Sequence, residues 1–218
     1  MSCAVKSVTR LKFGMGRVTP IRLKSNPSKK KDVTCRILTR CTRDTEASIH
    51  IGLAQALPKG KKFEEIIRKN TEIGVQEFLP LITERTEIRY PSHKWRGVHE
   101  RWKRVAISAM KQSGRTILPD IHPPQPVSDI LTSTQNYELK LIASAFEHDV
   151  TIRDVLHAYP DLTSVLICIG PEGGFTEAEV TQAKSHDFRA ITLGKRRLRT
   201  ETAGAVAAGI FAGYYDNP

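Results

Sequence analysis

Residues 165–208 carry the sequence VLICIGPEGGFTEAEVTQAKSHDFRAITLGKRRLRTETAGAVAA, which the rest of the chain is expected to serve. Two short apolar runs, residues 165–169 and 189–193, each lead into a glycine, a polar loop and then a segment of helical character. Loops of this kind lie at the carboxyl ends of parallel strands, where open α/β sheets bind their ligands. The stretch therefore predicts a ligand pocket that is built by two loops.

The loop after the first run is rich in residues with special backbone properties. Pro171 fixes its own φ, while Gly173 and Gly174 allow positive φ and a close approach of a ligand to the backbone. Thr176 and Glu179 match a capping box, which predicts that a helix begins there. The loop is neither a phosphate P-loop nor a GxGxxG dinucleotide loop. On composition alone, an ordinary strand–helix turn explains it equally well.

The loop after the second run combines positive charge with very small side chains. Four cations precede Glu201: Lys195, Arg196, Arg197 and Arg199. The helix that is predicted to follow consists largely of Ala and Gly, which favours a backbone or a flat ligand packed closely against it. Solvated surface charge for the cations, and tight helix–sheet or subunit packing for the helix, are the alternative interpretations.

Strands and helices alternate along the upstream part of the chain. Predicted strands cover residues 49–57, 75–82 and 139–145, and predicted helices cover residues 61–73, 98–112 and 152–158. Gly74 is expected to end the first helix, and Pro80 argues against a central place for its strand. The alternation, with short connections, predicts a three-layer α/β domain with a parallel sheet from residue 48 onward.

Positive charge is concentrated at the N-terminus. The chain has 218 residues and a formal net charge of +11, and residues 1–47 hold 12 Lys and Arg against 3 Asp and Glu, a balance of +9. A basic segment with short β-like runs beside a nearly neutral body favours a module that faces nucleic acid. A solubilising basic tail is the alternative.

Other sequence features narrow the class of protein. The four cysteines form neither a CxxC motif nor a His/Cys cluster, which predicts reduced thiols in the cytoplasm and no metal site. No apolar run reaches the roughly 20 residues of a membrane span, and the N-terminus has no signal-peptide core. We therefore expect a cytoplasmic protein without a membrane partner.

The residues of these two loops, together with several upstream motifs, carry a resemblance to a known family. Gly170-Pro171-Glu172-Gly173-Gly174-Phe175-Thr176 and Leu198-Arg199-x-Glu201-Thr202-Ala203 resemble the two C-terminal signatures of the RsmE-type 16S rRNA (uridine-N3) methyltransferases of the SPOUT superfamily. Further signatures stand upstream in the same order: Leu53-Ala54-Gln55-Ala56-Leu57-Pro58-Lys59-Gly60, Lys69-x-Thr71-Glu72-x-Gly74-Val75, Pro80-Leu81-Ile82-Thr83-Glu84-Arg85 and Gln112-Ser113-Gly114-Arg115. The ordered matches cover residues 49–212, so the resemblance is specific.

The resemblance implies a SPOUT-type parallel sheet whose C-terminal chain threads a trefoil knot, a topology that is otherwise rare. It also implies a homodimer that binds S-adenosylmethionine in a bent shape and methylates N3 of a uridine in 16S rRNA of the small ribosomal subunit. The family begins with a PUA-like β-barrel. Residues 1–47 are expected to form a basic, incomplete version of that barrel, and residues 48–218 the methyltransferase domain.

By matching position, the resemblance places the cofactor in three loop segments, residues 169–174, 193–197 and 198–203. The residues expected to bind S-adenosylmethionine are Ile169, Gly170, Pro171, Gly173, Gly174, Leu193, Gly194, Arg197, Leu198, Thr202 and Ala203. Those expected to contact RNA are Arg10, Lys12, Arg85 and Arg115, and the last two could hold the partner subunit instead.

Two residues are candidates for catalysis, because the weakly acidic imide of uracil must lose its proton. Arg199 is expected to orient the uracil or to stabilise its developing charge. Glu201 is expected to pair with an arginine and order the loop, or to act near the proton. The chain departs from the family pattern at Asn70 and Lys111. A non-catalytic RNA-binding or ribosome-assembly protein of the same fold, and a SPOUT methyltransferase for another RNA, remain the alternatives.

Overall fold

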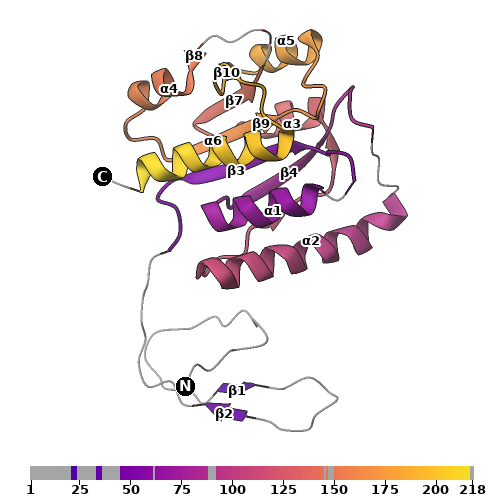
Figure 1. The fold of residues 1–218 in the computed structure, drawn as a ribbon, viewed down its shortest axis with the longest axis vertical. Coiled ribbons are helices and arrows are strands. Elements are labelled where there is room, and N and C mark those ends of the chain that lie inside the picture. Colours follow the sequence, from indigo (N-terminus) through magenta and orange to yellow (C-terminus); the bar gives the residue numbers. More distant parts are fainter. Residues whose placement is uncertain are drawn as a thin grey trace. The chain divides into compact units, whose positions relative to one another are not determined.

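The apolar runs of the sequence form the centre of one parallel sheet (Figure 1). Its strands lie in the order β5-β4-β3-β9-β7-β10-β8, with β6 beside β4, and all their pairings are parallel. Two strands lie at the centre, β3 (His50–Ala56) and β9 (Ser164–Ile169), and both are buried along nearly their whole length. Because parallel neighbours need crossover connections, helices must cover the faces of such a sheet.

The computed structural model describes residues 21–23, 33–35, 45–60, 62–87, 92–144, 146 and 150–216. The chain divides into two compact units, Met1–Asp44 and Thr45–Pro218. In the first unit, β1 (Ile21–Leu23) pairs antiparallel with β2 (Val33–Cys35). The remaining strands are β4 (Glu77–Ile82), β5 (Asp120–Ile121), β6 (Gln125–Pro126), β7 (Leu139–Ala143), β8 (Val150–Thr151) and β10 (Arg189–Thr192). The helices are α1 (Lys62–Ile73), α2 (Ser92–Ser113), α3 (Val127–Ser133), α4 (Ile152–Ala158), α5 (Glu177–Ser185) and α6 (Thr200–Tyr215).

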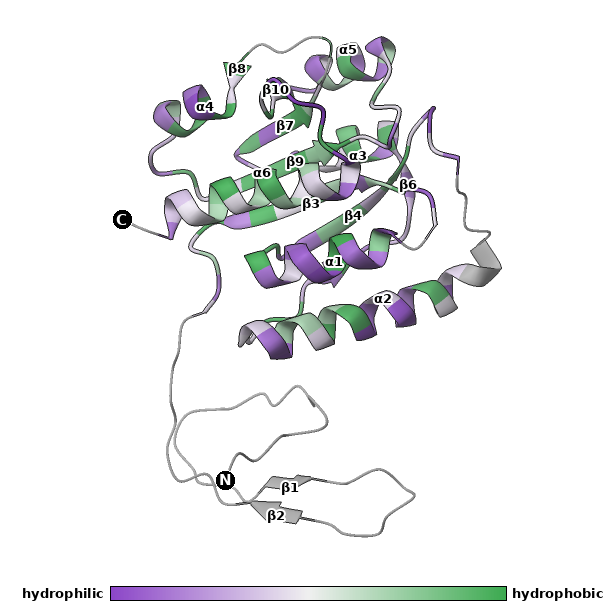
Figure 2. Ribbon diagram, viewed as in Figure 1, coloured by the Kyte–Doolittle hydropathy of each residue, from purple (hydrophilic) through white to green (hydrophobic). Residues whose placement is uncertain are grey.

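Helices cover both faces of the sheet, which confirms the predicted three-layer α/β architecture. One apolar cluster joins the sheet to α1, α2, α4 and α6, and a second joins its other face to α3 and α5. Figure 2 shows apolar stripes along the helices that alternate with polar ones. In the first layer, the rings of Phe63 and Trp102 lie 4.3 Å apart and hold α1 to α2. Most of residues 1–47 lie outside the described residues, so the PUA-like module stays a prediction.

The helix after β4 is longer than its apolar pattern predicts. α2 begins at Ser92, whereas the periodicity predicts a start at residue 98. Arg96 and Gly97, in its first turns, are exposed, and Trp95 and Val98 pack against the core. With polar residues and a glycine in these turns, the sequence offers little helical periodicity from which to place the start.

The expectation that Pro80 keeps its strand away from the centre is wrong. β4 pairs with β3 on one side and with both β5 and β6 on the other. Phe78 faces this second side, where its carbonyl accepts from the amide of His122, so Pro80 two residues later faces it too. Pro80, which has no N–H to donate, therefore faces the gap between the short strands β5 and β6, where the hydrogen bonding along this side of β4 is interrupted.

The helix of small residues packs closely, as predicted. α6 lies against α1, β3 and β9 (Figure 1). A Cβ atom on Gly204 would lie 2.8 Å from Oε1 of Gln55, so a larger residue there would force that buried side chain to shift. Gly74 ends α1 with a φ of 122°, also as predicted. Among the described residues, no helix combines the length and the apolar character that a membrane crossing requires.

A charged cluster lies where β3 and β4 begin, at the opposite end of the strands from the predicted pocket. Nε2 of His122 lies 2.7 Å from Oε1 of Glu77, and the Tyr137 hydroxyl donates to the other carboxylate oxygen. The hydrogen bond with His122 lowers the pKa of Glu77 against the effect of burial, and the bond with Glu77 raises the pKa of His122. The pair therefore links stability to pH.

We expect the free-energy difference of unfolding between wild type and His122→Gln to depend on pH. The raised pKa of His122 adds stability that is complete below the unfolded value of 6.5 and is lost as the pH rises through the folded value. The lowered pKa of Glu77 adds stability above 4.5. The difference should therefore be largest between pH 4.5 and 6.5. After allowance for solvent screening it should stay below about 1 kcal/mol.

Urea denaturation of both proteins at several pH values measures this difference. His157→Gln, at an exposed position on α4, is the control and should show no such trend. If the difference in unfolding free energy between wild type and His122→Gln is the same at pH 6 and pH 9, the pair of His122 and Glu77 does not contribute to the pH dependence of stability.

Candidate functional site

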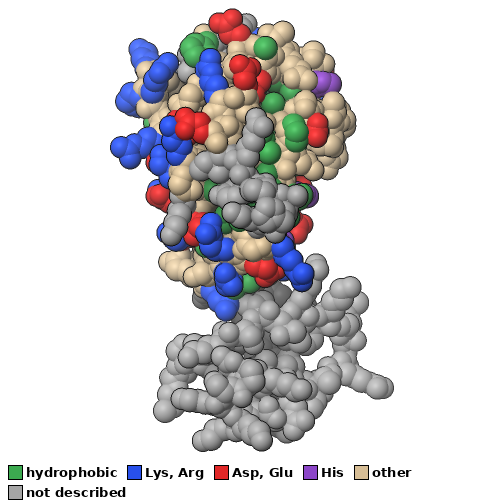
Figure 3. Space-filling model, turned by 90° about the vertical axis from the view of Figure 1, so that its right-hand side faces the viewer, with side chains coloured by type: hydrophobic (Ala, Val, Ile, Leu, Met, Phe, Trp, Pro, Cys, Tyr) green, Lys and Arg blue, Asp and Glu red, His purple; other side chains and the backbone are tan. Residues whose placement is uncertain are grey.

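Four loops meet at the edge where the parallel strands end. They follow β3, β4, β9 and β10, and the predicted cofactor segments lie in the last two loops, the end of β9 and the first turn of α6. This edge is the right-hand side of Figure 1, which Figure 3 shows face-on, with Lys and Arg side chains gathered along one flank. The location agrees with the general rule that open parallel sheets bind ligands beyond the carboxyl ends of their strands.

The loop after β9 is a tight turn followed directly by a helix. The amide of Gly174, with a φ of 70°, donates to the carbonyl of Pro171 at 2.9 Å. Thr176 accepts from the amide of Glu179 at 3.2 Å, and the Glu179 carboxylate accepts from the amide of Thr176 at 2.8 Å. The predicted capping box is thus confirmed, and it fixes where α5 begins.

Neighbouring loops hold this turn from two sides. The Lys62 ammonium donates to Glu172 Oε1 at 3.2 Å, and the amide of Lys59 donates to the same atom at 3.2 Å. Burial raises the pKa of Glu172, but hydrogen bonds with the Glu172 backbone, Lys62 and Lys59 outweigh this and leave the pKa lowered. On the other side, Nη1 of Arg85 donates to the carbonyl of Gly173 at 2.6 Å. Arg85 thus helps to hold the loop in shape. Its side chain is exposed, and its predicted contact with RNA stays a prediction.

The loop after β10 presents its charges to solvent and its apolar side chains to the core. Exposed residues in this loop are Gly194, Lys195, Arg196, Arg197 and Arg199. Leu193 and Leu198 are half-buried and pack against the main apolar cluster. Arg199 is the N-cap residue of α6. The loop therefore places an apolar wall beside a row of cations.

A buried hydrogen-bond chain joins the two loops. The Thr200 hydroxyl donates to the carbonyl of Gly170 at 2.6 Å, and the Gln55 amide donates to the Thr200 hydroxyl at 2.7 Å. All three residues are buried; Thr200 begins α6, Gly170 follows β9 and Gln55 lies in β3. The contact brings the start of α6 back from β10 to β9, across the intervening strand β7. The two cofactor loops that the sequence predicts therefore lie side by side.

Glu201 is buried at the first turn of α6, near a lysine at the start of α1. Its Oε2 has no hydrogen-bond partner among the described residues, and Nζ of Lys62 lies 3.9 Å away. Within the described residues Glu201 lies nearest to a lysine, so its pairing with an arginine, like its alternative role near the proton, stays a prediction. Sequence reasoning missed Lys62; its position just after the Lys59-Gly60 signature was the available signal.

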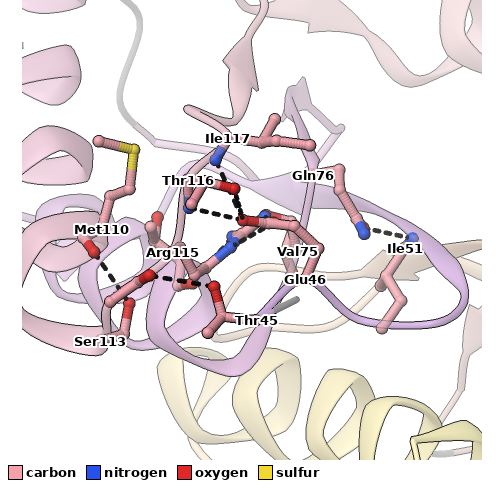
Figure 4. Close-up of polar contacts among 12 residues, drawn as sticks. Thr45, Glu46, Ile51, Val75, Gln76, Met110, Ser113, Arg115, Thr116 and Ile117 are labelled. Carbon is pink, nitrogen blue, oxygen red and sulfur yellow. Dashed lines mark hydrogen bonds and ion pairs between the residues drawn. The ribbon is translucent and has the colours of Figure 1, made fainter. Parts of the chain in front are cut away.

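The Arg115 side chain is buried inside the domain, although Gly114 and Thr116 beside it are exposed. Its side chain is only 2% exposed, and it donates to Glu46 and to the carbonyls of Thr71 and Val75 (Figure 4). The Glu46 carboxylate also accepts from the amides of Thr116 and Ile117. These contacts replace the predicted RNA-binding role of Arg115 with a structural one. Arg10 and Lys12 lie outside the described residues.

The site leaves room for a bound molecule. A Cβ atom built on Gly174 or Gly194 would meet no atom within 4 Å, and both glycines have positive φ. Leu193 and Leu198 offer an apolar wall, and Oε2 of Glu201 offers a buried acceptor. A flat ring together with hydrogen-bonding groups, as in S-adenosylmethionine, fits this set of residues. Among the residues that the structure describes, no group of three or more metal-ligating side chains comes together.

Comparison with protein families supports this picture. A family model described as an RNA methyltransferase domain matches residues 45–212. The ribosomal RNA small subunit methyltransferase E of Bacillus subtilis (strain 168) is 33% identical over 178 residues, which covers 80% of this chain and 70% of the relative. The protein of that name from Synechocystis sp. is 35% identical over 175 residues, covering 80% of this chain and 56% of the relative.

Solved structures show the same fold. Ribosomal RNA small subunit methyltransferase E from Neisseria gonorrhoeae, bound to S-adenosyl methionine, has a TM-score of 0.79 at 31% identity. The match covers 92% of this chain and 80% of that one. A Legionella pneumophila protein in complex with the bound cofactor SAM has a TM-score of 0.76 at 34% identity and covers 85% and 74% of the two chains.

Proposed function

Since this chain belongs to the family of ribosomal RNA small subunit methyltransferase E, we propose that it transfers a methyl group from S-adenosylmethionine to N3 of a uridine in 16S rRNA. Methylation of ribosomal RNA with this cofactor follows from the family membership. The choice of uridine N3 rests on the C-terminal signatures that contain Arg199 and Glu201. We place the activity in the cytoplasm, on the small ribosomal subunit.

One observation carries the proposal: the hydrogen bond from Thr200 to the carbonyl of Gly170 joins the two signature loops. With Gln55 behind it, this contact holds the Gly-rich turn beside the loop of cations. Gly174 and Gly194, one in each loop, have open space beside them, where an added Cβ atom would meet no atom within 4 Å. A binding site for one cofactor follows from that arrangement.

The chain's own residues supply binding, orientation and charge. When bound, S-adenosylmethionine supplies an electrophilic methyl group on a sulfonium. Arg199 lies exposed at the start of α6, where its guanidinium can reach a uracil and stabilise the charge that develops as N3 loses its proton. Glu201, buried behind it, keeps a carboxylate oxygen free of protein hydrogen bonds. We assign Glu201 to ordering this loop, through Lys62, or to the path of the proton.

We also propose that the C-terminal chain is threaded as a trefoil knot. Support comes from the path of residues 193–200, which leave β10, pass beyond β7 and reach Gly170 at the end of β9. α6 then packs against α1, β3 and β9. In a trefoil knot, this last segment would thread behind a loop that formed earlier in the chain.

The outer face of α6 favours a second copy of the chain as its partner. Ala205, Val206, Gly209 and Ile210 are only partly buried, and Tyr214 is 42% exposed. This apolar face continues the helix that begins at the site, so a homodimer would cover the face and complete the site. The expected molecular mass in light scattering is twice that of the 24.4 kDa chain.

Calorimetric titration with S-adenosylhomocysteine, the demethylated product, tests the proposed function. We expect saturable heat with one site per chain. Absence of heat would favour the alternative of a non-catalytic RNA-binding protein of the same fold.

Gly170→Ala should weaken cofactor binding sharply. A Cβ atom on this residue would lie 3.0 Å from the backbone of Gly174 and of Phe175, so the turn would have to shift. We expect affinity for S-adenosylhomocysteine to fall by at least about tenfold, or about 1.4 kcal/mol. Gly97→Ala on α2, where an added Cβ meets no atom within 4 Å, is the matched control. Equal affinity in both variants would contradict the geometry described for the turn.

A further inference from the structure

The outer face of α2 carries a stripe of positive charge. Between Trp95 and Ser113, the exposed residues are Arg96, Gly97, Glu100, Lys103, Arg104, Ser108, Lys111 and Gln112. Four of them are cations and one is an acid. With 3.6 residues per turn, the four cations fall within an arc of about 100° around the helix axis. We call Arg96, Lys103, Arg104 and Lys111 the α2 stripe.

The cations of the α2 stripe have no ion pair among the described residues. On the same two-helix layer, Nε of Arg101 lies 2.8 Å from Glu64, and Lys69 lies 2.8 Å from Glu65. Charges that serve only local helix stability are commonly paired in this way. Glu100 lies within the same arc, so this face presents a net charge of +3 to a partner outside the chain.

One end of the stripe lies near the candidate site, and the other lies near the start of the α/β unit. From Arg96 to Lys111 it extends about 22 Å, at 1.5 Å per residue. α2 starts beyond the loop that follows β4, at the edge of the candidate site. At its other end, Gly114 and Arg115 bind Thr45 and Glu46, the first residues of the α/β unit. The segment that precedes them in the chain carries most of the net charge.

We propose that the α2 stripe binds the sugar–phosphate backbone of the rRNA substrate, a role that rests on the proposed function. Four unpaired cations along one exposed helix face complement a strand of phosphates, and such contacts position RNA without reading its sequence. The stripe lies outside the cofactor loops, so it contributes to RNA affinity and leaves cofactor binding unchanged.

A double variant tests this surface. Lys103→Gln with Arg104→Gln removes two adjacent charges at exposed positions. The probe is 16S rRNA, with the dissociation constant measured over a range of KCl concentrations. Loss of two phosphate contacts should reduce the slope of log K against log[salt] by about 1.4 to 1.8. At low salt the affinity should fall about tenfold or more, and affinity for S-adenosylhomocysteine should match wild type.

The control removes the same charge elsewhere. Arg153→Gln with Arg189→Gln changes two exposed cations at the opposite edge of the domain, near α4 and β10 (Figure 1). This variant should keep the wild-type slope. If both double variants reduce the salt slope equally, the α2 stripe is not a specific RNA-binding surface. A wild-type slope in Lys103→Gln with Arg104→Gln would contradict the proposal in the same way. If wild type itself fails to bind 16S rRNA, the proposed function falls, and the role of the stripe falls with it.

Discussion

Arg199→Ala should lower the rate of methyl transfer by at least about 100-fold, because removing one donor that stabilises developing negative charge typically costs 10² to 10³ in rate. Arg199 is exposed, and it is the N-cap residue of α6, at the point where the two cofactor loops meet. Its side chain makes no cap hydrogen bond, so its loss should leave the helix intact.

Two measurements separate this catalytic role from a structural one. Affinity of Arg199→Ala for S-adenosylhomocysteine should stay within about tenfold of wild type, or about 1.4 kcal/mol. Arg196→Ala removes an exposed cation from the same loop and should keep most of the activity. Full turnover in Arg199→Ala would exclude the guanidinium from the mechanism.

Arg115→Met should cost about 3 kcal/mol of unfolding free energy, in the range found when one partner of a buried ion pair is removed. The change leaves the Glu46 carboxylate, with its side chain 14% exposed, without a countercharge. It also removes the donor that the carbonyls of Thr71 and Val75 share. Urea denaturation at pH 7 measures the loss.

The same variant should respond to acid. Burial raises the pKa of Glu46, but hydrogen bonds from Arg115 and from the amides of Thr116 and Ile117 outweigh it, so the pKa is lowered. The stability from this group is present above the unfolded value of 4.5 and is lost as the pH falls through the folded value. The penalty of Arg115→Met should therefore shrink in acid. Lys111→Met, at an exposed position, is the control, and an equal loss in both variants would contradict the buried role of Arg115.

The sequence was sufficient to predict what depends on local pattern. The capping box of Thr176 and Glu179, the glycine that ends α1 and the buried strands β7 and β9 all follow from residue types at fixed spacing. Each of these features is set by neighbours within a few residues, so periodicity and turn chemistry identify them. The order of the elements then gives the three-layer fold.

Features that depend on distant residues could not be predicted in this way. Lys62 meets Glu201, and Arg115 meets Glu46, only because the fold brings separate segments together. For the same reason, the sequence could not show that Arg115 is buried. The expectation that Pro80 keeps β4 from a central place was wrong because the gap between β5 and β6, which Pro80 faces, depends on the pairing of strands. Long-range pairs of this kind decide which charges of the site remain free.

The most direct test of the central claim is to map methylated nucleotides by mass spectrometry. Small ribosomal subunits from a strain that lacks this chain would be incubated with the purified protein and S-adenosylmethionine. We predict one new N3-methyluridine in 16S rRNA, formed by wild type and lost with Arg199→Ala. An unmodified 16S rRNA, together with methylation of tRNA by the same preparation, would contradict the proposed substrate.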